Sequence, residues 1–203
     1  MNDTLEIKNY DNREDFKLSF NKIAKLILNF TELKTKKSAF LIREIEFYYH
    51  SPNHTDFYCH KNERQLTNSR LYFHRFKDPE TYLKLRRKGI DITFGGNKKN
   101  YGGILIRAIE NIETKEIYTG IGKITNLIID EIGGIPVIQE LYKSDKNVFQ
   151  PNSVLYLEQS ADNNLKIFKK NRQGINIKNE DTEGFYLNSK YNYSTYPEIE
   201  EVI

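Results

Sequence analysis

The sequence predicts one α+β domain with a mostly antiparallel sheet, and three observations support this. The chain has 203 residues, of which 38% are hydrophobic, so it can bury one core of ordinary size but hardly two. A pattern of helical period is followed by several patterns of strand period. Gly-rich turns separate two of the strand patterns and indicate a hairpin. We therefore expect residues 1–203 to form a single domain.

The first element is predicted to be a helix that begins after Asp11 or Asn12, because both side chains can cap a helix. Its apolar stripe comprises Phe16, Phe20, Ile23, Ile27 and Phe30, widened by Leu26 and Leu33. After a polar turn at residues 34–37, residues 39–50 have the composition of a strand that ends at Ser51-Pro52-Asn53. We expect the strand to carry a functional site at that end.

Strict alternation along this strand assigns its side chains to two faces. One face would hold Phe40, Ile42, Glu44, Glu46, Tyr48 and His50, and the other Leu41, Ile45, Phe47 and Tyr49, interrupted by Arg43. Two carboxylates, a phenol and an imidazole would then share one face. Such a grouping is unusual for the centre of a sheet and favours a site.

Weaker patterns complete the chain. Further strands are expected at residues 90–94, 103–109, 153–157 and 184–188, and helices at residues 79–87, 123–130 and 136–142. Gly95-Gly96-Asn97 and Tyr101-Gly102-Gly103 predict a hairpin between the first two of these strands. The acidic residues 196–203 are expected to form a loosely held tail.

Several protein classes are disfavoured by composition. The sequence has no run of roughly 18 apolar residues, as a membrane span requires, and its start lacks the pattern of a secretory signal. Its single cysteine, Cys59, can form neither an internal disulfide nor a thiolate metal site by itself. We therefore expect a cytoplasmic protein, near the nucleoid if the source is bacterial, that is stabilised by packing.

Positive charge is concentrated in one part of the chain. Residues 61–99 contain eleven Lys and Arg against four acids, an excess of +7, whereas the whole chain carries +3. Aromatic and imidazole side chains interleave with these charges, namely Tyr72, Phe73, His74, Phe76 and Tyr82. Clustered cations with flat side chains suit a polyanion with bases. A solvated surface is the alternative interpretation of the charges.

Residues 44–60 hold the densest group of chemically active side chains: Glu44, Glu46, His50, His54, Asp56, Cys59 and His60. One hypothesis is a metal-dependent hydrolase, although the intervening Ser51-Pro52-Asn53 prevents His50 and His54 from sharing a helix face. A second is that the histidines only cap turns. A third is a carboxylate acting as general base between walls that hold a flat substrate, for which a nucleobase is the natural candidate.

Seven motifs in order resemble one enzyme family. Residues 42–48, Ile-Arg-Glu-Ile-Glu-Phe-Tyr, resemble the active-site strand of the alkyladenine (3-methyladenine) DNA glycosylases. The other motifs lie at Glu63-Arg64-Gln65 with Asn68 and Arg70, and at residues 103–110, 120–124, 155–158, 172–175 and 184–189. The motifs run from residue 42 to residue 189, and the colinear resemblance as a whole extends over roughly residues 23–193, which is most of the chain.

The resemblance implies a curved antiparallel sheet, a partly open barrel flanked by helices, in a monomeric, monofunctional DNA N-glycosylase of base excision repair. Such an enzyme flips a damaged or modified base out of DNA and hydrolyses its N-glycosidic bond. Glu46 would activate the water, Tyr48 would stack on the flipped base, and His60 would form the opposite wall, with His54 as its competitor. Arg107 would contact the backbone of the flipped nucleotide. Neither a metal nor another cofactor is implied.

The resemblance has gaps that leave the substrate open. Where the family has a stacking tyrosine and a wedge tyrosine, this chain has Lys84 and the pair Arg87-Lys88. We expect these cations, together with Arg64 and Lys123, to contact DNA, duplex in preference to single-stranded. A different modified base or a free nucleoside is also compatible. The alternative function is a non-catalytic nucleic-acid-binding module in which Arg43, Arg64 or Arg107 merely pairs with Glu46.

Overall fold

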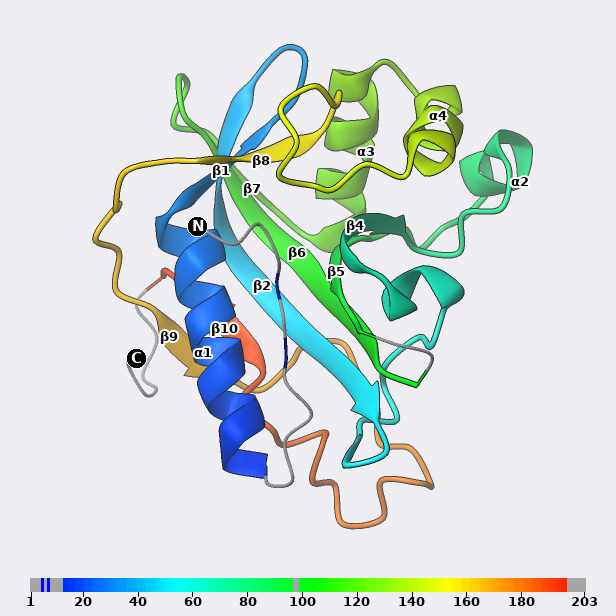
Figure 1. Cartoon of the computed structure of the whole chain (residues 1–203), viewed down its shortest axis with the longest axis vertical. Helices are drawn as coiled ribbons and strands as arrows, with labels where there is room; N and C mark the ends of the chain where they lie inside the picture. The colour runs from blue at the N-terminus through cyan, green and yellow to red at the C-terminus, as the bar shows by residue number, and fades with distance from the viewer. Residues whose placement is uncertain (1–4, 6, 8–12, 97–98, 197–203) are drawn as a thin grey trace.

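The computed structural model describes residues 5, 7, 13–96 and 99–196. These residues form one α+β domain in which a curled antiparallel sheet is flanked by helices (Figure 1). The predicted fold class is confirmed. The strands are β1 (Thr31–Lys34), β2 (Ala39–Ser51), β3 (His54–Thr55), β4 (Asn68–Phe73), β5 (Ile90–Phe94), β6 (Tyr101–Asn111), β7 (Ile117–Thr119), β8 (Tyr156–Gln159), β9 (Phe168–Lys170) and β10 (Asn192–Ser194). The helices are α1 (Arg13–Asn29), α2 (Pro79–Leu83), α3 (Ile121–Ile132) and α4 (Pro136–Ser144), with a 3-10 helix at Glu63–Leu66.

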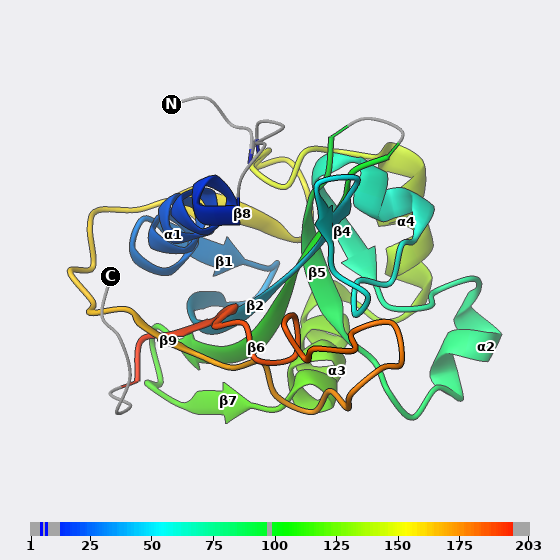
Figure 2. The same cartoon turned by 90° about the horizontal axis from the view of Figure 1, so that it is seen from below.

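The sheet is built around the two longest strands, β2 and β6. Its main order is β4-β5-β6-β2-β1-β8, and β10 adds a further pairing to the middle of β2. Strong twist curls the sheet into a half-barrel, which is clearest along the view of Figure 2. The middle of β2, where Glu46 lies opposite Asn192 of β10, is therefore surrounded by other strands.

Two compensating bulges interrupt the pairing of β2 with β6. Ile42 pairs with Ile109, Glu44 with Ala108, and Ile45 with Ile106, so that Arg43 and Arg107 are each skipped. A skipped residue changes which face the following side chains occupy.

The bulges correct the strict alternation expected for residues 39–50. Phe40 and Ile42 belong to the buried core together with Ile45, Phe47 and Tyr49. Core side chains therefore sit at even positions before the bulge and at odd positions after it. The expected grouping of Glu44, Glu46, Tyr48 and His50 opposite this core is retained, but without Phe40 and Ile42.

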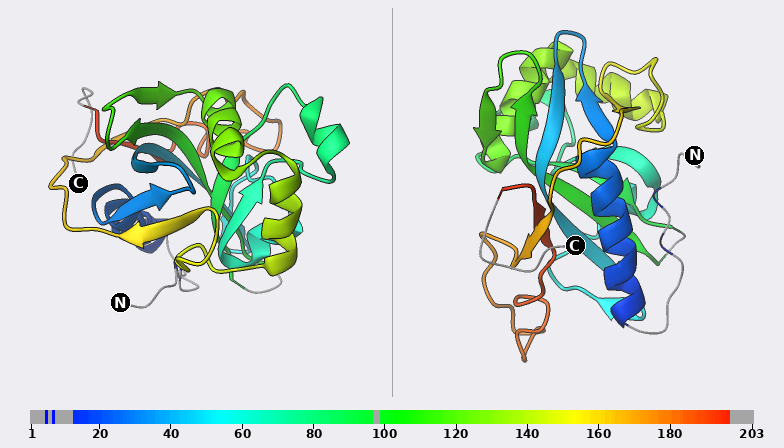
Figure 3. Two further views of the ribbon diagram at one scale, coloured as in Figure 1. Left: turned by 90° about the horizontal axis from the view of Figure 1, so that it is seen from above. Right: turned by 90° about the vertical axis from the view of Figure 1, so that its left-hand side faces the viewer.

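Helix α1 covers the concave face of the sheet (Figure 3). The helix expected from the apolar stripe is confirmed over Arg13–Asn29, where Phe16 and Phe20 are fully buried, but it ends before Phe30, and Leu33 of the expected stripe lies in β1. The ring of Phe20 stacks on that of Phe47 with 4.6 Å between centroids, which fixes the helix against β2. Within the described residues, no helix is long and apolar enough to cross a membrane.

Other predicted elements need adjustment. Residues 184–188 form turns, because the Asp181 carboxylate accepts the backbone N–H groups of Tyr186 and Leu187 that a strand would need. The strand expected at 153–157 begins only at Tyr156, and the helix expected at 79–87 ends at Leu83. Strands β5 and β6 pair antiparallel, as the hairpin predicts, although residues 97–98 of its loop lie outside the described residues. Of the predicted tail, residues 197–203 also lie outside them.

Candidate active site

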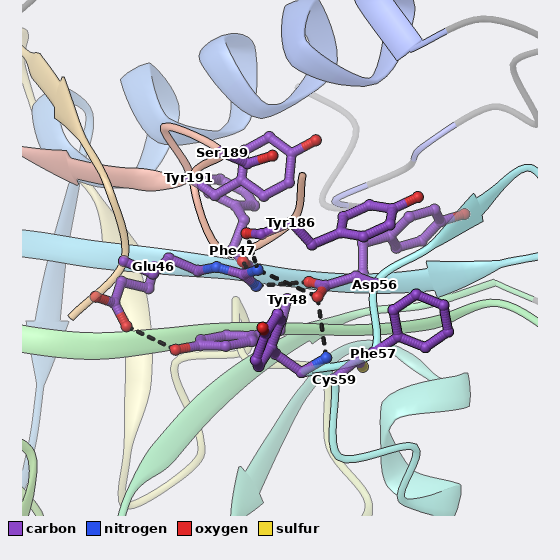
Figure 4. Close-up of polar contacts among 12 residues, drawn as sticks. Glu46, Phe47, Tyr48, Asp56, Phe57, Cys59, Tyr186, Ser189 and Tyr191 are labelled. Atoms are coloured by element: carbon purple, nitrogen blue, oxygen red, sulfur yellow. Dashed lines mark hydrogen bonds and ion pairs between the residues drawn. The ribbon is translucent and has the colours of Figure 1, made fainter. Parts of the chain in front are cut away.

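Glu46 is a completely buried carboxylate at the centre of the sheet. Its Oε2 accepts hydrogen bonds from the Tyr48 hydroxyl at 2.8 Å and from Nη1 of Arg107 at 3.1 Å. Its Oε1 accepts from the backbone N–H of Gln173 at 2.7 Å and from Nδ2 of Asn192 at 2.9 Å. Figure 4 shows Tyr48 reaching Glu46. Four donors from four separate segments thus hold this carboxylate in one orientation.

A second carboxylate, Glu44, shares two of these donors. Its Oε1 lies 3.4 Å from Nε of Arg107 and accepts from Nδ2 of Asn192 at 2.7 Å. Nζ of Lys170 lies 3.5 Å from the same oxygen. Arg107 and Lys170 therefore compensate the charges of two neighbouring acids.

A cavity of about 480 Å³ opens beside this cluster. Its flat walls are Tyr48, Tyr58, His60 and His74; its cations are Arg75, Arg86, Arg87 and Lys88; Leu105, residues 121–122 and residues 173–176 complete the lining. Tyr48 and Gln173 both line the cavity and bond Glu46. The carboxylate therefore lies one layer behind the cavity wall.

His60 and His74 form one side of the cavity. Their ring centroids are 4.5 Å apart, with the rings edge to face. Desolvation, aided by the neighbouring His74, lowers the pKa of His60 to about 4, so its ring is neutral near pH 7. Nε2 of His74 is bonded to Oδ1 of Asp91 at 2.5 Å, and Asp91 is buried and also accepts from Nε2 of Gln65 at 3.0 Å.

The ring of Tyr48 rests on a buried ion pair. Asp56 and Arg172 are paired with both side chains completely buried. The Arg172 guanidinium lies over the rings of Tyr48, at 4.6 Å, and Tyr58, at 5.3 Å. Figure 4 shows Asp56 and Tyr48 on neighbouring segments of this site. The pair therefore supports both tyrosines that line the cavity.

Comparison with known proteins identifies a viral relative whose name states no activity. No family model matches the sequence. The chain is 35% identical over 159 residues to "Uncharacterized protein L759" of Acanthamoeba polyphaga mimivirus, covering 68% of this chain and 71% of that protein. The chain belongs to the same family as this mimivirus protein.

In this member of the family, His54 does not reach the cavity. It is completely buried below α1, with 5.0 Å between the centroids of its ring and that of Phe16. Nδ1 bonds the carbonyl of Tyr49 at 2.8 Å, and Nε2 bonds the hydroxyl of Tyr191 at 2.9 Å. Both ring nitrogens are thus committed to the core. This position corrects the expectation that His54 competes with His60 for the base.

The structure also disfavours the metal-dependent alternative, because the side chains expected to bind the metal do not lie together. Asp56 is engaged with Arg172, and His54 is engaged with the core. His50 bonds the backbone carbonyl of Asp56 at 3.3 Å, while His60 faces the cavity. Among the described residues, no three His, Cys, Asp or Glu side chains are grouped as a metal ion requires. The cluster that looks dense in sequence is dispersed in space.

The predicted DNA-contacting cations fall into two groups. Arg87 and Lys88 line the cavity, and exposed Lys123 follows Ile121 and Gly122 of its lining. Lys84, by contrast, is exposed at the end of α2 and outside the lining.

Three arginines have partners that change their expected roles. Arg64 bonds Asp145 at 3.1 Å and lies over the Tyr142 ring, away from the cavity. Arg107 faces Glu44 and Glu46, which corrects its expected contact with the nucleotide backbone. Arg43 lies near Glu110. Of the three arginines considered as partners of Glu46, the structure therefore selects Arg107.

Sequence reasoning missed several residues of this site, among them Asn192, which donates to Glu44 and Glu46, and the residues His74, Arg172 and Asp91. In the sequence, His74 belongs to a basic aromatic run and Arg172 to a motif, and neither pattern indicates the residue's partner. Asp91 pairs with Tyr72 across β4 and β5, and Tyr72 lies two positions before His74. His74 directly follows β4, and Asp91 lies on the neighbouring strand near the end of β4. An acid in this position relative to a histidine could have indicated the Asp91–His74 pair.

Proposed function

We propose that this chain is a monofunctional DNA N-glycosylase that hydrolyses the bond between a modified, flipped base and its sugar. The observation that supports it is the position of Glu46, held by Arg107 directly behind a cavity with aromatic and imidazole walls. A stacked base cannot be reached by a side chain, so such chemistry requires flipping into a pocket of this kind.

Tyr48 and His60 suit the two sides of a flat base. Both line the cavity, whose volume of about 480 Å³ is in the range of small-molecule sites. Stacking on an aromatic ring contributes about 1–3 kcal/mol per base. The neutral ring of His60 can also donate or accept one hydrogen bond at the base edge.

The hydrolytic step uses Glu46 as general base. In the free protein the Tyr48 hydroxyl donates a hydrogen bond to Oε2 of Glu46. A base that stacks on Tyr48 must therefore displace this hydroxyl, so that a water can bind Oε2 in its place. The water gives its proton to Glu46 while its oxygen forms a bond to C1′ of the sugar. The C1′–N bond breaks with its electron pair on the base, which takes up a proton from solvent, and Glu46 returns its proton to solvent. Arg107 keeps the carboxylate aimed throughout.

The cationic edge of the cavity suits the DNA backbone. Arg86 and Arg87 are exposed and Lys88 is half-buried at this edge. Neutralising phosphates with such side chains releases counterions, so binding should weaken as salt rises.

A non-catalytic nucleic-acid-binding module is the second candidate. One observation favours it: Glu46 is fully buried and already accepts four hydrogen bonds. A carboxylate with this environment could serve only to brace Arg107 and Asn192.

Single-turnover base release distinguishes the two candidates. Labelled duplex and single-stranded oligonucleotides carrying alkylated, deaminated and hypermodified bases would be treated with wild type and Glu46→Gln, each with and without chelator. Loss of a general base should reduce release at least about 100-fold. The surface variant Glu140→Gln, 68% exposed, is the control and should match wild type. If neither wild type nor variant releases any base while both bind DNA equally, the binding module is correct.

A further inference from the structure

The charged side chains that line the cavity are all positive. The lining contains Arg75, Arg86, Arg87 and Lys88, and no Asp or Glu. In the described part of the chain, Arg75, Arg86 and Arg87 have no carboxylate partner. Two buried acids lie behind the wall: Glu46 is bonded to Arg107, and Asp91 is bonded to His74. The four cations of the lining thus outnumber Asp91, which lies behind the wall and has no Lys or Arg partner among the described residues, and they produce a positive potential at the opening.

The aromatic walls strengthen this asymmetry. Arg172 lies over Tyr48 at 4.6 Å, and both Arg172 and Lys178 lie 5.3 Å from the ring centroid of Tyr58. A cation is attracted to the electron-rich face of an aromatic ring. Because Lys178 already lies at the ring of Tyr58, a second cation stacked on that ring would be repelled, whereas the charge of Arg172 is compensated by Asp56.

His60 responds to the same field. Desolvation is the main cause of its lowered pKa of about 4, and His74, Arg75 and Lys178 act in the same direction, although Asp91 opposes them. A positively charged base beside this ring would meet the same desolvation and the same neighbouring charges as a proton on it.

From this arrangement we infer that the cavity selects its base by charge, binding bases with an anionic substituent best, uncharged bases less well, and positively charged alkylated bases worst. The inference rests on the proposed function for its view that the ligand is a base. The charge preference itself is a property of the cavity walls. It separates this chain from enzymes whose substrates are cationic alkylpurines.

Nucleosides test this inference without interference from backbone phosphates. The isomers 3-methylcytidine, a cation near neutral pH, and 5-methylcytidine, which is uncharged, differ in charge but not in composition. 5-Carboxycytidine supplies the anion. For a purine, 1-methyladenosine is the cation and N6-methyladenosine is its uncharged isomer. Binding to the full-length protein would be measured by titration calorimetry at low and high salt.

We expect each cation to bind at least about tenfold more weakly than its uncharged isomer, and 5-carboxycytidine at least about tenfold more tightly than 5-methylcytidine. Arg75→Gln should reduce the preference for the anion severalfold. Lys143→Gln, whose side chain is 71% exposed and pairs with Glu140, should leave it unchanged. High salt should narrow the differences.

Equal binding of the cationic and uncharged isomers, or no binding of any nucleoside at millimolar concentration, would overturn the inference. Its failure can be told apart from that of the proposed function. Glu46-dependent release of cationic bases would retain the glycosylase and reject the charge selection. The expected order of binding without release of any base would retain the charge selection and reject the glycosylase.

Discussion

The hydroxyl of Tyr48 donates a 2.8 Å hydrogen bond to Oε2 of Glu46, while the ring that carries it forms part of the cavity wall. The position of this one side chain therefore determines both the surface that a base would stack on and the access of water to the carboxylate. Burial, with the nearby Glu46 charge, raises the pKa of Tyr48 well above its ordinary value, so the hydroxyl remains a donor.

Substitutions at Tyr48 should separate its two roles. Tyr48→Phe keeps the ring and removes the donor, so single-turnover base release should be within about threefold of wild type or faster. Tyr48→Ala removes the ring, and the loss of about 1–3 kcal/mol of stacking should raise the half-saturating substrate concentration by roughly 5–150-fold. If Tyr48→Phe were as defective as Tyr48→Ala, the hydroxyl would have a role beyond occupying the carboxylate.

The loss of stability on breaking the Asp56–Arg172 pair should come mainly from leaving a buried charge without a partner, and less from the lost attraction between the two charges. Asp56→Ala leaves a buried guanidinium without its partner and should lower the free energy of unfolding by about 3–5 kcal/mol, measured by urea denaturation. Adding Arg172→Met should recover a large part of this loss. The exposed pair of Lys143 and Glu140 is the control, and Lys143→Ala should change the same quantity by less than about 1 kcal/mol. A similar loss in both pairs would contradict the burial argument.

The sequence predicted the elements that depend on local periodicity. The stripe containing Phe16 and Phe20 identified α1, and the β-branched and aromatic run identified β2. The side-chain faces of β2 were only partly predicted, because the bulges at Arg43 and Arg107 depend on pairing with β6. A bulge is a relation between two strands, so the alternation expected for one strand alone does not locate it.

The site was predicted where its residues are close in sequence and missed where the fold brings them together. Glu46 and Tyr48 lie on one strand, so alternation placed them on one face. Arg172 reaches Asp56 across a separation of 116 residues, and no spacing rule could pair them. The expectation that His54 and His60 compete for one position was wrong for the opposite reason. The two histidines are close in sequence, but His54 is buried in the core and His60 lines the cavity.

Gly89 is expected to be required for the position of His74. A Cβ at residue 89 would lie 2.6 Å from Nδ1 of His74, so Gly89→Ala must push the imidazole away from Asp91. We expect a lower melting temperature and weaker nucleoside binding. Gly96→Ala is the matched control, because a Cβ there meets no atom within 4 Å and should change neither property comparably. Unchanged binding in Gly89→Ala would show that His74 is not part of the base-binding wall.

The lowered pKa of His60 predicts a specific dependence of stability on pH. Between about pH 4, its pKa in the folded protein, and its ordinary value of 6.5, the unfolded chain binds more protons at this residue than the folded chain does. Its contribution therefore makes the free energy of unfolding rise with pH across this window and fall as the solution is acidified. The pKa values of His50 and His54 are lowered as well, mainly by desolvation, so wild type combines three contributions of the same sign. His60→Gln should become progressively more stable relative to wild type as pH falls from 7 to 4.5, which urea midpoints would measure. Direct titration of the His60 ring by NMR should give a midpoint near 4, and a midpoint at or above 6.5 would show that the ring can accept a proton beside Arg75 and His74 without penalty.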